Sequence, residues 1–172
     1  MLILGSSGRL GSFISRSQNF MPDSELLLHS RKLSGAISAD LTNREETLKM
    51  LDQIRPDAII NTVALAEIEA CEKSPSRAYS NNILTIQNVV KWIAESSANC
   101  HLVHISTDHV YDGEGQHKEN SVNLTNYYAY SKFASELVAE QIPSTVLRTN
   151  FVGKTVSNLR QTFSDWVVVN LR

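Results

Sequence analysis

The sequence predicts an α/β fold in which a doubly wound parallel β-sheet carries helices on both faces. Short apolar runs alternate with longer stretches of helical periodicity, the order expected of parallel strands joined by crossover helices. The first apolar run leads directly into a glycine-rich turn, as in many sheets of this kind. With 172 residues the chain can bury one sizeable core but hardly two, so we expect a single compact unit.

The first half of the chain is expected to alternate strands and helices closely. In order, these are a buried strand over residues 1–4, a helix over 10–17, a strand over 25–29, a helix over 42–54 and a strand over 58–61. Thr42 or Asn43 is placed to cap the second helix, because a side-chain oxygen there can accept a free amide of the first turn. Pro56 closes that helix.

The second half is expected to hold longer elements. They are a helix over residues 74–98, a strand over 102–106, a polar loop over 108–126, a helix over 127–141 and a strand over 145–148. Pro75 suits the first turn of the long helix, where its missing amide costs nothing, and Pro143 ends the later one. Residues 165–172 are apolar and periodic but stop without a capping or turn residue.

Composition limits the classes of protein. A net charge of -2 with 42% hydrophobic and 20% charged residues is ordinary for a soluble domain, so no nucleic-acid partner is expected. Gly5 cuts the first apolar run short, so the run forms neither a signal-peptide core nor a membrane span, and a cytoplasmic location is expected. Cys71 and Cys100 lack a metal-ligand spacing; we interpret them as reduced structural thiols and expect no metal site.

Gly5, Gly8 and Gly11 stand at intervals of three between the first strand and the first helix. Such a turn is tight, a side chain in it would block a diphosphate, and the third glycine lets the helix pack against the strand. The free amides at the helix start can then receive the anion. The spacing is that of the short-chain dehydrogenases and predicts a Rossmann-type nicotinamide dinucleotide site. A glycine turn without a ligand is the alternative.

The end of the second strand bears on which dinucleotide binds. An acidic residue there would hold the adenosine ribose, whereas a basic one would hold a 2'-phosphate. The sequence has Ser30, Arg31 and Lys32 after His29, with no carboxylate. NADP is therefore favoured and NAD stays open, the alternative being that Arg31 and Lys32 form a solvated surface pair.

Tyr128 and Lys132 stand four residues apart on a predicted helix, so both emerge on one face. A free phenol titrates near pH 10 and transfers protons poorly near neutrality, but a neighbouring lysine charge stabilises the phenolate. Thr107, at the end of the fourth strand, can hydrogen-bond a substrate carbonyl and the phenol together. The alternatives are a solvated helix face for the pair and a turn-capping hydroxyl for Thr107.

Several motifs together resemble the dTDP-4-dehydrorhamnose reductase family of extended short-chain dehydrogenases, and the resemblance spans nearly the whole chain. These motifs are the glycine turn, Asp40-Leu41, residues 61–65, residues 106–113, the tyrosine-lysine helix and Leu147-Arg148-Thr149. The most specific is the stretch of residues 106–113, which starts with serine, threonine and aspartate and ends in an aspartate-glycine turn. Shorter dehydrogenases generally lack it.

The resemblance implies roles for individual residues. Thr107 polarises the carbonyl, Tyr128 donates the proton, and Lys132 is its electrostatic partner and a ribose ligand, while Asp108 and Phe151 lie at the sugar. The implied cofactor contacts are Gly5, Ser7, Gly8, Arg9, Leu10 and Gly11 around the diphosphate, Ser30 and Arg31 after the second strand, Asp40 and Leu41 at the adenine, Val63, Ala64 and Leu65 toward the ribose and diphosphate, Asn82, Ile105 at the nicotinamide pocket, and Tyr128 and Lys132.

The chain also departs from the family. Thr62-Val63 replaces an alanine pair and is expected to narrow the cofactor channel, and Phe151 stands where rhamnose-forming members often have tryptophan. The family continues for roughly another hundred residues, the size of a further lobe. Residues 1–172 are thus expected to be the NAD(P)-binding Rossmann domain, with the C-terminal sugar-nucleotide-binding lobe largely absent.

The function that the resemblance implies is that of an NADPH-dependent oxidoreductase acting on the C4 carbonyl of a nucleotide-linked 4-keto-6-deoxy sugar. One alternative is a sugar-nucleotide epimerase or dehydratase of the same superfamily. Dehydratases usually carry an acid–base carboxylate beside the threonine, and Asp108 stands where it could be mistaken for one, so product analysis must decide. Another is a non-catalytic NADP-binding regulatory module like the beta subunit of methionine adenosyltransferase, and a third is a fragment that binds NADP without turnover. The expected partner is a nucleotide sugar, with no nucleic acid and no membrane; homodimer formation is left open.

Overall fold

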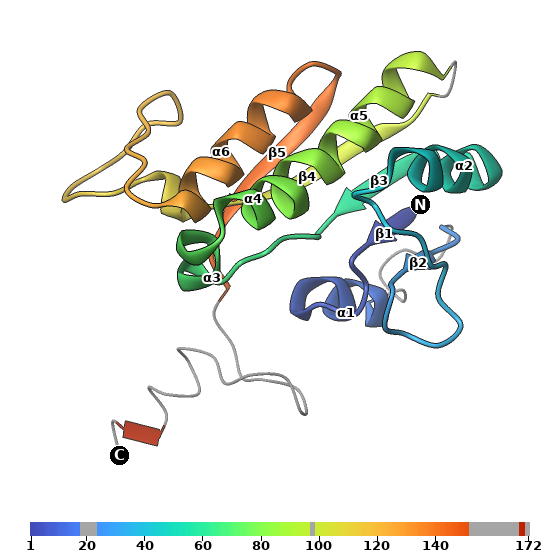
Figure 1. Ribbon diagram of the computed structural model, residues 1–172, viewed down its shortest axis with the longest axis horizontal. Helices are drawn as coiled ribbons and strands as arrows, with labels where there is room; N and C mark the ends of the chain where they lie inside the picture. Colours follow the sequence, from blue (N-terminus) through green and yellow to red (C-terminus); the bar gives the residue numbers. More distant parts are fainter. Residues whose placement is uncertain (18–23, 97–98, 152–168, 171–172) are drawn as a thin grey trace.

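The computed structural model describes residues 1–17, 24–96, 99–151 and 169–170, and its core is a five-stranded sheet in the order β2-β1-β3-β4-β5 (Figure 1). Every neighbouring pair is parallel. The strands are β1 (Leu2–Leu4), β2 (Leu27–His29), β3 (Ala58–Asn61), β4 (His101–Thr107) and β5 (Ser144–Thr149). The predicted Rossmann-type α/β class is confirmed.

The strand order reverses direction at β1, and this places helices on both faces. The chain moves from β1 outward to β2 and then back past β1 to β3, and right-handed crossovers in opposite directions lie on opposite faces. Helix α1 (Arg9–Arg16) accordingly packs on one face. Helices α2 (Arg44–Ile54), α5 (Thr85–Glu95) and α6 (Tyr127–Ala139) lie side by side on the other (Figure 1).

The main core lies between the sheet and α2, α5 and α6. Alternate strand residues point into it because successive side chains of a strand face opposite ways. Leu2, Leu4, Ile59 and Leu102 enter from the strands and meet apolar side chains of the three helices. Both cysteines are buried and free, as interpreted from the sequence. No helix among the described residues is both long and apolar enough to cross a membrane.

Helix ends follow the local sequence. Asn43, not Thr42, caps α2, accepting the Glu46 amide on its side chain at 3.2 Å. The helix ends at Ile54, and Arg55 then takes a left-handed conformation with φ 45° before Pro56. Asn126 caps α6 by accepting the Ala129 amide at 2.8 Å. The segment of residues 165–172 lies almost wholly outside the described residues.

The helix expected over residues 74–98 runs without a gap from Pro75 to Glu95, but a π-helical turn interrupts its α-helical pattern. The structure has α3 (Ile68–Lys73), which the sequence did not predict, then α4 (Pro75–Ala78), a π-helical turn η2 (Tyr79–Leu84) and α5. Ser74, with φ -147°, breaks the path between α3 and α4. Pro75 does occupy the first turn of a helix, as expected. The π turn matters because it holds Asn82, one of the expected cofactor residues.

Candidate active site

The carboxyl ends of β1, β3 and β4 meet where the strand order reverses, which is where open parallel sheets bind ligands. The glycine turn follows β1, residues 62–65 follow β3, and Thr107 ends β4. The topology therefore brings the three predicted segments to one edge of the sheet, although they are far apart in the sequence.

The glycine turn has the geometry that its residues predict. Gly5 has φ +82°, which side chains rarely adopt, and Gly11 packs so closely on the turn that a Cβ would lie 2.9 Å from Ser6 Cα. A Cβ on Gly8 would meet only the Gly5 carbonyl oxygen, at 3.2 Å. Gly8 precedes α1, and no side chain caps the helix start. An open side over an uncapped helix start fits a diphosphate.

The turn after β2 is built on a serine hydroxyl. Ser30 donates to the Ser7 hydroxyl at 2.8 Å and accepts the amides of Lys32 and Leu33 at 3.0 and 3.2 Å. Arg31 extends from this turn, with 61% of its side chain exposed, and forms an ion pair with Asp40 at 3.7 Å. Ser7, Ser30 and Arg31 thus stand together beside the glycine turn.

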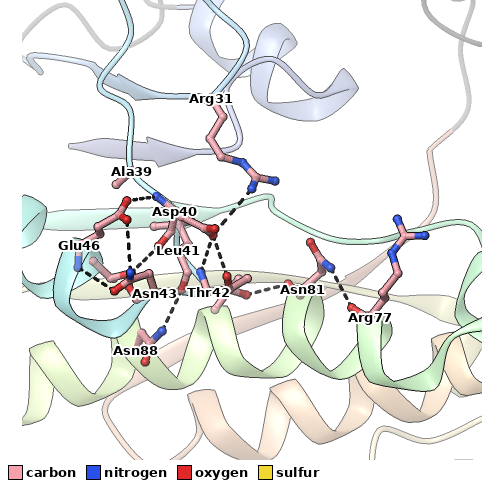
Figure 2. A network of polar contacts seen from close by, with 12 residues as sticks. Arg31, Ala39, Asp40, Leu41, Thr42, Asn43, Glu46, Arg77, Asn81 and Asn88 are labelled. Atoms are coloured by element: carbon pink, nitrogen blue, oxygen red, sulfur yellow. Dashed lines mark hydrogen bonds and ion pairs between the residues drawn. The ribbon is translucent and has the colours of Figure 1, made fainter.

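Asp40 and Leu41 lie in a polar network between α2 and α5 (Figure 2). Asp40 accepts both the amide and the hydroxyl of Thr42, and these hydrogen bonds lower the pKa of its carboxyl. Asn88 of α5 donates to the Leu41 carbonyl oxygen at 2.9 Å. The side of the site expected to hold the adenine is therefore fixed by internal contacts, and Asp40 also forms the ion pair with Arg31.

Tyr128 and Thr107 come together at the end of β4. Burial raises the pKa of Tyr128, and interaction of the phenol with the Thr107 side chain opposes that rise. The Thr107 hydroxyl also accepts the His109 amide at 3.2 Å and so caps the short 3-10 turn η3 (Asp108–Val110). Thr107 thus combines the two readings that its sequence position allowed, a turn cap and a partner of the phenol.

Lys132 lies one helical turn after Tyr128 on α6 and is only 2% exposed. Its Nζ donates to the Ile105 carbonyl oxygen at 2.7 Å. Burial lowers the pKa of Lys132 to about 8, against the opposing effect of the Glu136 carboxylate. The phenol, the hydroxyl and the ammonium therefore all converge on the last residues of β4.

Asn82 fixes the loop after β3. Its Oδ1 accepts the Leu65 amide at 2.7 Å, and its Nδ2 donates to the Leu65 carbonyl at 3.1 Å and to the Ser131 hydroxyl at 2.8 Å. Ser131 in turn donates to the Tyr128 carbonyl at 2.8 Å. The loop that carries Val63, Ala64 and Leu65 is thereby tied to the helix of Tyr128. Sequence reasoning missed Ser131, which has no signature beyond its place between Tyr128 and Lys132.

The residues expected at the sugar lie just outside this centre. Asp108 accepts a hydrogen bond from Asn150 at 2.8 Å, which joins the turn after β4 to the end of β5. Asn150 had no predicted role. Phe151 follows it and is 52% exposed. The Thr62 hydroxyl, expected to narrow the cofactor channel, donates to the Leu4 carbonyl at 2.7 Å and so joins the end of β3 to β1.

Comparison with known proteins gives a consistent picture. The family model described as the RmlD substrate binding domain matches residues 1–167. The dTDP-4-dehydrorhamnose reductase of Aggregatibacter actinomycetemcomitans is 30% identical over 159 residues, 88% of this chain and 51% of that protein.

Two solved structures are also similar. A hypothetical dTDP-4-dehydrorhamnose reductase from Sulfolobus tokodaii superposes with a TM-score of 0.76 at 34% identity, over 86% of this chain and 54% of that one. The Bacillus anthracis dTDP-4-dehydrorhamnose reductase, solved in complex with NADP, superposes with a TM-score of 0.74 at 26% identity, over 86% and 51%. The chain thus spans about half the length of the relatives it matches.

Proposed function

The chain belongs to the RmlD substrate-binding domain family, and from that premise we propose that it is the cofactor-binding and catalytic part of an NADPH-dependent reductase of nucleotide-linked 4-keto-6-deoxy sugars. The observation that carries the proposal is the convergence of Thr107, Tyr128 and Lys132 on the end of β4, at the same edge of the sheet as the glycine turn. A phenol, a hydroxyl and a buried ammonium at this edge of a parallel sheet suit the reduction of a carbonyl.

The residues around the glycine turn fit a dinucleotide. The open side of Gly8 and the uncapped start of α1 would accommodate the diphosphate. The loop of Val63 to Leu65, held by hydrogen bonds to Asn61 and Asn82, would border the ribose. Arg31 would hold a 2'-phosphate, because its largely exposed guanidinium can donate to the phosphate oxygens, while the Ser30 hydroxyl fixes the turn that carries Arg31. This is the support for NADP over NAD, and the Bacillus anthracis relative was solved with NADP.

The chain's own residues handle the proton in the proposed reaction. When bound, NADPH supplies the hydride that the carbonyl carbon of the substrate accepts. Tyr128 donates its phenolic proton to the carbonyl oxygen as negative charge develops there. Thr107 interacts with the phenol and would hydrogen-bond the same substrate oxygen. The positive charge of Lys132, one helical turn further along α6, would favour the phenolate left behind. Asp108, Asn150 and Phe151 border the side from which the sugar would enter.

The test is a spectrophotometric assay of NADPH oxidation with a panel of nucleotide-linked keto sugars, including dTDP-4-keto-6-deoxy sugars. Oxidation with a 4-keto-6-deoxy sugar, accompanied by the 4-hydroxy product, supports the reductase. Conversion of the sugar without net NADPH oxidation favours an epimerase or dehydratase. NADPH binding with no conversion of any sugar would overturn the reductase and leave a binding module.

A further inference from the structure

Beneath the proposed active centre lies a buried carboxylate that the chemistry described above does not use. Glu136 is on α6, one helical turn after Lys132, and is only 1% exposed. Its carboxylate accepts hydrogen bonds from Arg148 of β5, at 3.0 and 3.1 Å from Nε and 2.6 Å from Nη2, and from the Ser106 hydroxyl of β4. A charge buried to this degree persists only if it is paired and hydrogen-bonded, and here both conditions are met.

Two successive turns of α6 therefore hold two successive residues of β4. Lys132 binds the carbonyl oxygen of Ile105, and Glu136 binds the side chain of Ser106. The next residue along the strand is Thr107, the hydroxyl of the proposed active centre. The position of Thr107 relative to α6, and hence to Tyr128, is thus set by these two contacts immediately before it.

Arg148 extends the same arrangement to the loop after β4. Its Nη1 donates to the Tyr111 hydroxyl at 2.6 Å and to the Glu119 carbonyl oxygen at 2.7 Å. The paired Glu136 carboxylate raises the pKa of Arg148, so the guanidinium stays charged at any working pH. The loop that joins Thr107 to α6 is therefore fastened at its middle to the ion pair that holds the strand.

We propose that Glu136 is a positioning residue of the active centre: with Arg148 as its counterion, its carboxylate locks Ser106 to α6 and so sets Thr107 and Lys132 relative to one another. The inference rests on the proposed function for its meaning, but its structural content is measurable without turnover. Neither Glu136 nor Ser106 reaches the substrate in this role; each acts through a neighbour.

A charge effect accompanies the geometric one. The titratable groups that act on the Lys132 ammonium are Glu136 on α6 and His104 on β4, with Arg148 of β5 acting through Glu136. Among these, the Glu136 carboxylate favours the charged lysine, whereas burial opposes it. Neutralising Glu136 should therefore let Lys132 lose its proton at a lower pH, whereas loss of packing alone would expose Lys132 and move its pKa up.

The first measurement is an NMR titration of the Cε resonance of Lys132 in 13C-lysine-labelled protein, identified by its absence in Lys132→Arg. Glu136→Gln should lower the titration midpoint from about 8 by about one pH unit. Glu136→Asp, which keeps the charge, should restore most of the shift. Glu140→Gln, which removes an exposed carboxylate one turn further along, should change nothing. An unchanged or raised midpoint in Glu136→Gln overturns the proposal.

The second measurement tests the hydrogen bond between Ser106 and Glu136 and does not require Glu136→Gln to fold. Ser106→Ala removes the hydroxyl and no charge, and should shift or broaden the methyl resonance of Thr107, identified by its loss in Thr107→Ser. Ser144→Ala, which removes a hydroxyl bonded to the Ala139 carbonyl elsewhere, is the matched control. An unmoved Thr107 methyl in Ser106→Ala overturns the proposal. Both readouts use the protein without substrate, so a failed reductase assay leaves them valid.

Discussion

Asn61 and His104 are joined by a buried hydrogen bond, 3.1 Å from Asn61 Nδ2 to His104 Nδ1, between the end of β3 and the middle of β4. The side-chain Oδ1 of Asn61 accepts the Val63 amide, so Asn61 Nδ2 faces His104 as the donor and His104 Nδ1 is the acceptor. His104 Nε2 then donates to Ser135 at 2.9 Å. Ser135 donates in turn to the Lys132 carbonyl at 2.6 Å. A neutral histidine thus links the loop expected at the cofactor to the helix of the active centre.

His104 should make the fold acid-sensitive. Burial lowers its pKa well below 6.5, so below about pH 6.5 the unfolded chain binds a proton that the folded chain does not. The free energy of unfolding therefore suffers no loss from His104 above about pH 6.5. Below that pH it falls by up to about 1.4 kcal/mol per pH unit. Urea denaturation at pH 7 and pH 5 measures the loss. His104→Gln should reduce it, leaving the smaller part due to His29, whose pKa is also lowered; an equal loss in the variant contradicts the assignment.

Tyr128→Phe should remove turnover while sparing the cofactor. The phenol donates the proton in the proposed reaction, so kcat should fall by about 100-fold or more. The ring keeps its packing, and the Kd for NADPH, measured by fluorescence, should change less than about twofold. Tyr130→Phe, at an exposed tyrosine on the same helix, is the control. Equal activity in Tyr128→Phe and the unmodified chain would exclude Tyr128 as the proton donor.

Lys132→Met should raise the free energy of unfolding while weakening NADPH binding and turnover. The pKa of buried Lys132 is lowered from 10.5 to about 8, so the folded chain bears the cost of a buried charge below pH 8, and that cost vanishes as the pH rises through the window from 8 to 10.5. The variant should be more stable than the parent by about 1 kcal/mol or more at pH 7, with the difference shrinking by pH 10. Denaturation at both values tests the sign, and NADPH binding and turnover should both weaken.

Gly11→Ala should mainly lower the stability of the fold, whereas Gly8→Ala should mainly weaken NADPH binding. A Cβ at Gly11 meets the backbone of Gly5 and Ser6, so the variant should be destabilised by about 1–3 kcal/mol. A Cβ at Gly8 meets only the Gly5 carbonyl oxygen, at 3.2 Å, so Gly8→Ala should lower the melting temperature less than Gly11→Ala; Gly8, however, is proposed to border the diphosphate. Gly8→Ala should therefore weaken NADPH binding by about tenfold. Thermal melts with and without NADPH separate the two effects.

Arg31→Ser should change the preference between cofactors. Loss of the guanidinium removes a charge-assisted partner for a 2'-phosphate, and the Kd for NADPH should rise about tenfold while that for NADH stays within about twofold. Lys91→Ser, on the exposed side of α5 and paired only with Glu95 among the ion pairs described, is the control. Equal changes for both cofactors, or tighter binding of NADH than NADPH by the parent chain, would count against the NADP assignment.

The sequence by itself predicted the fold class and most element positions. Gly5, Gly8 and Gly11 act within one turn, and the caps Asn43 and Asn126 act within one helical turn, so their signals are local. The π turn within the helix that begins at Pro75 escaped prediction. Pro75 and the apolar periodicity suit a regular α-helix there, whereas the π turn is held by contacts of Asn82 with Leu65 and Ser131, which lie far from it in sequence.

Within the site, the sequence identified the residue types of Thr107, Tyr128 and Lys132 because their spacing and strand-end position are readable along the chain. That the three meet is a matter of tertiary structure: the strand order brings β4 beneath α6. The roles of Ser106, Glu136 and Arg148 were decided there alone. A buried carboxylate is tolerated only where partners from two other elements surround it, and no local pattern records which partners those are.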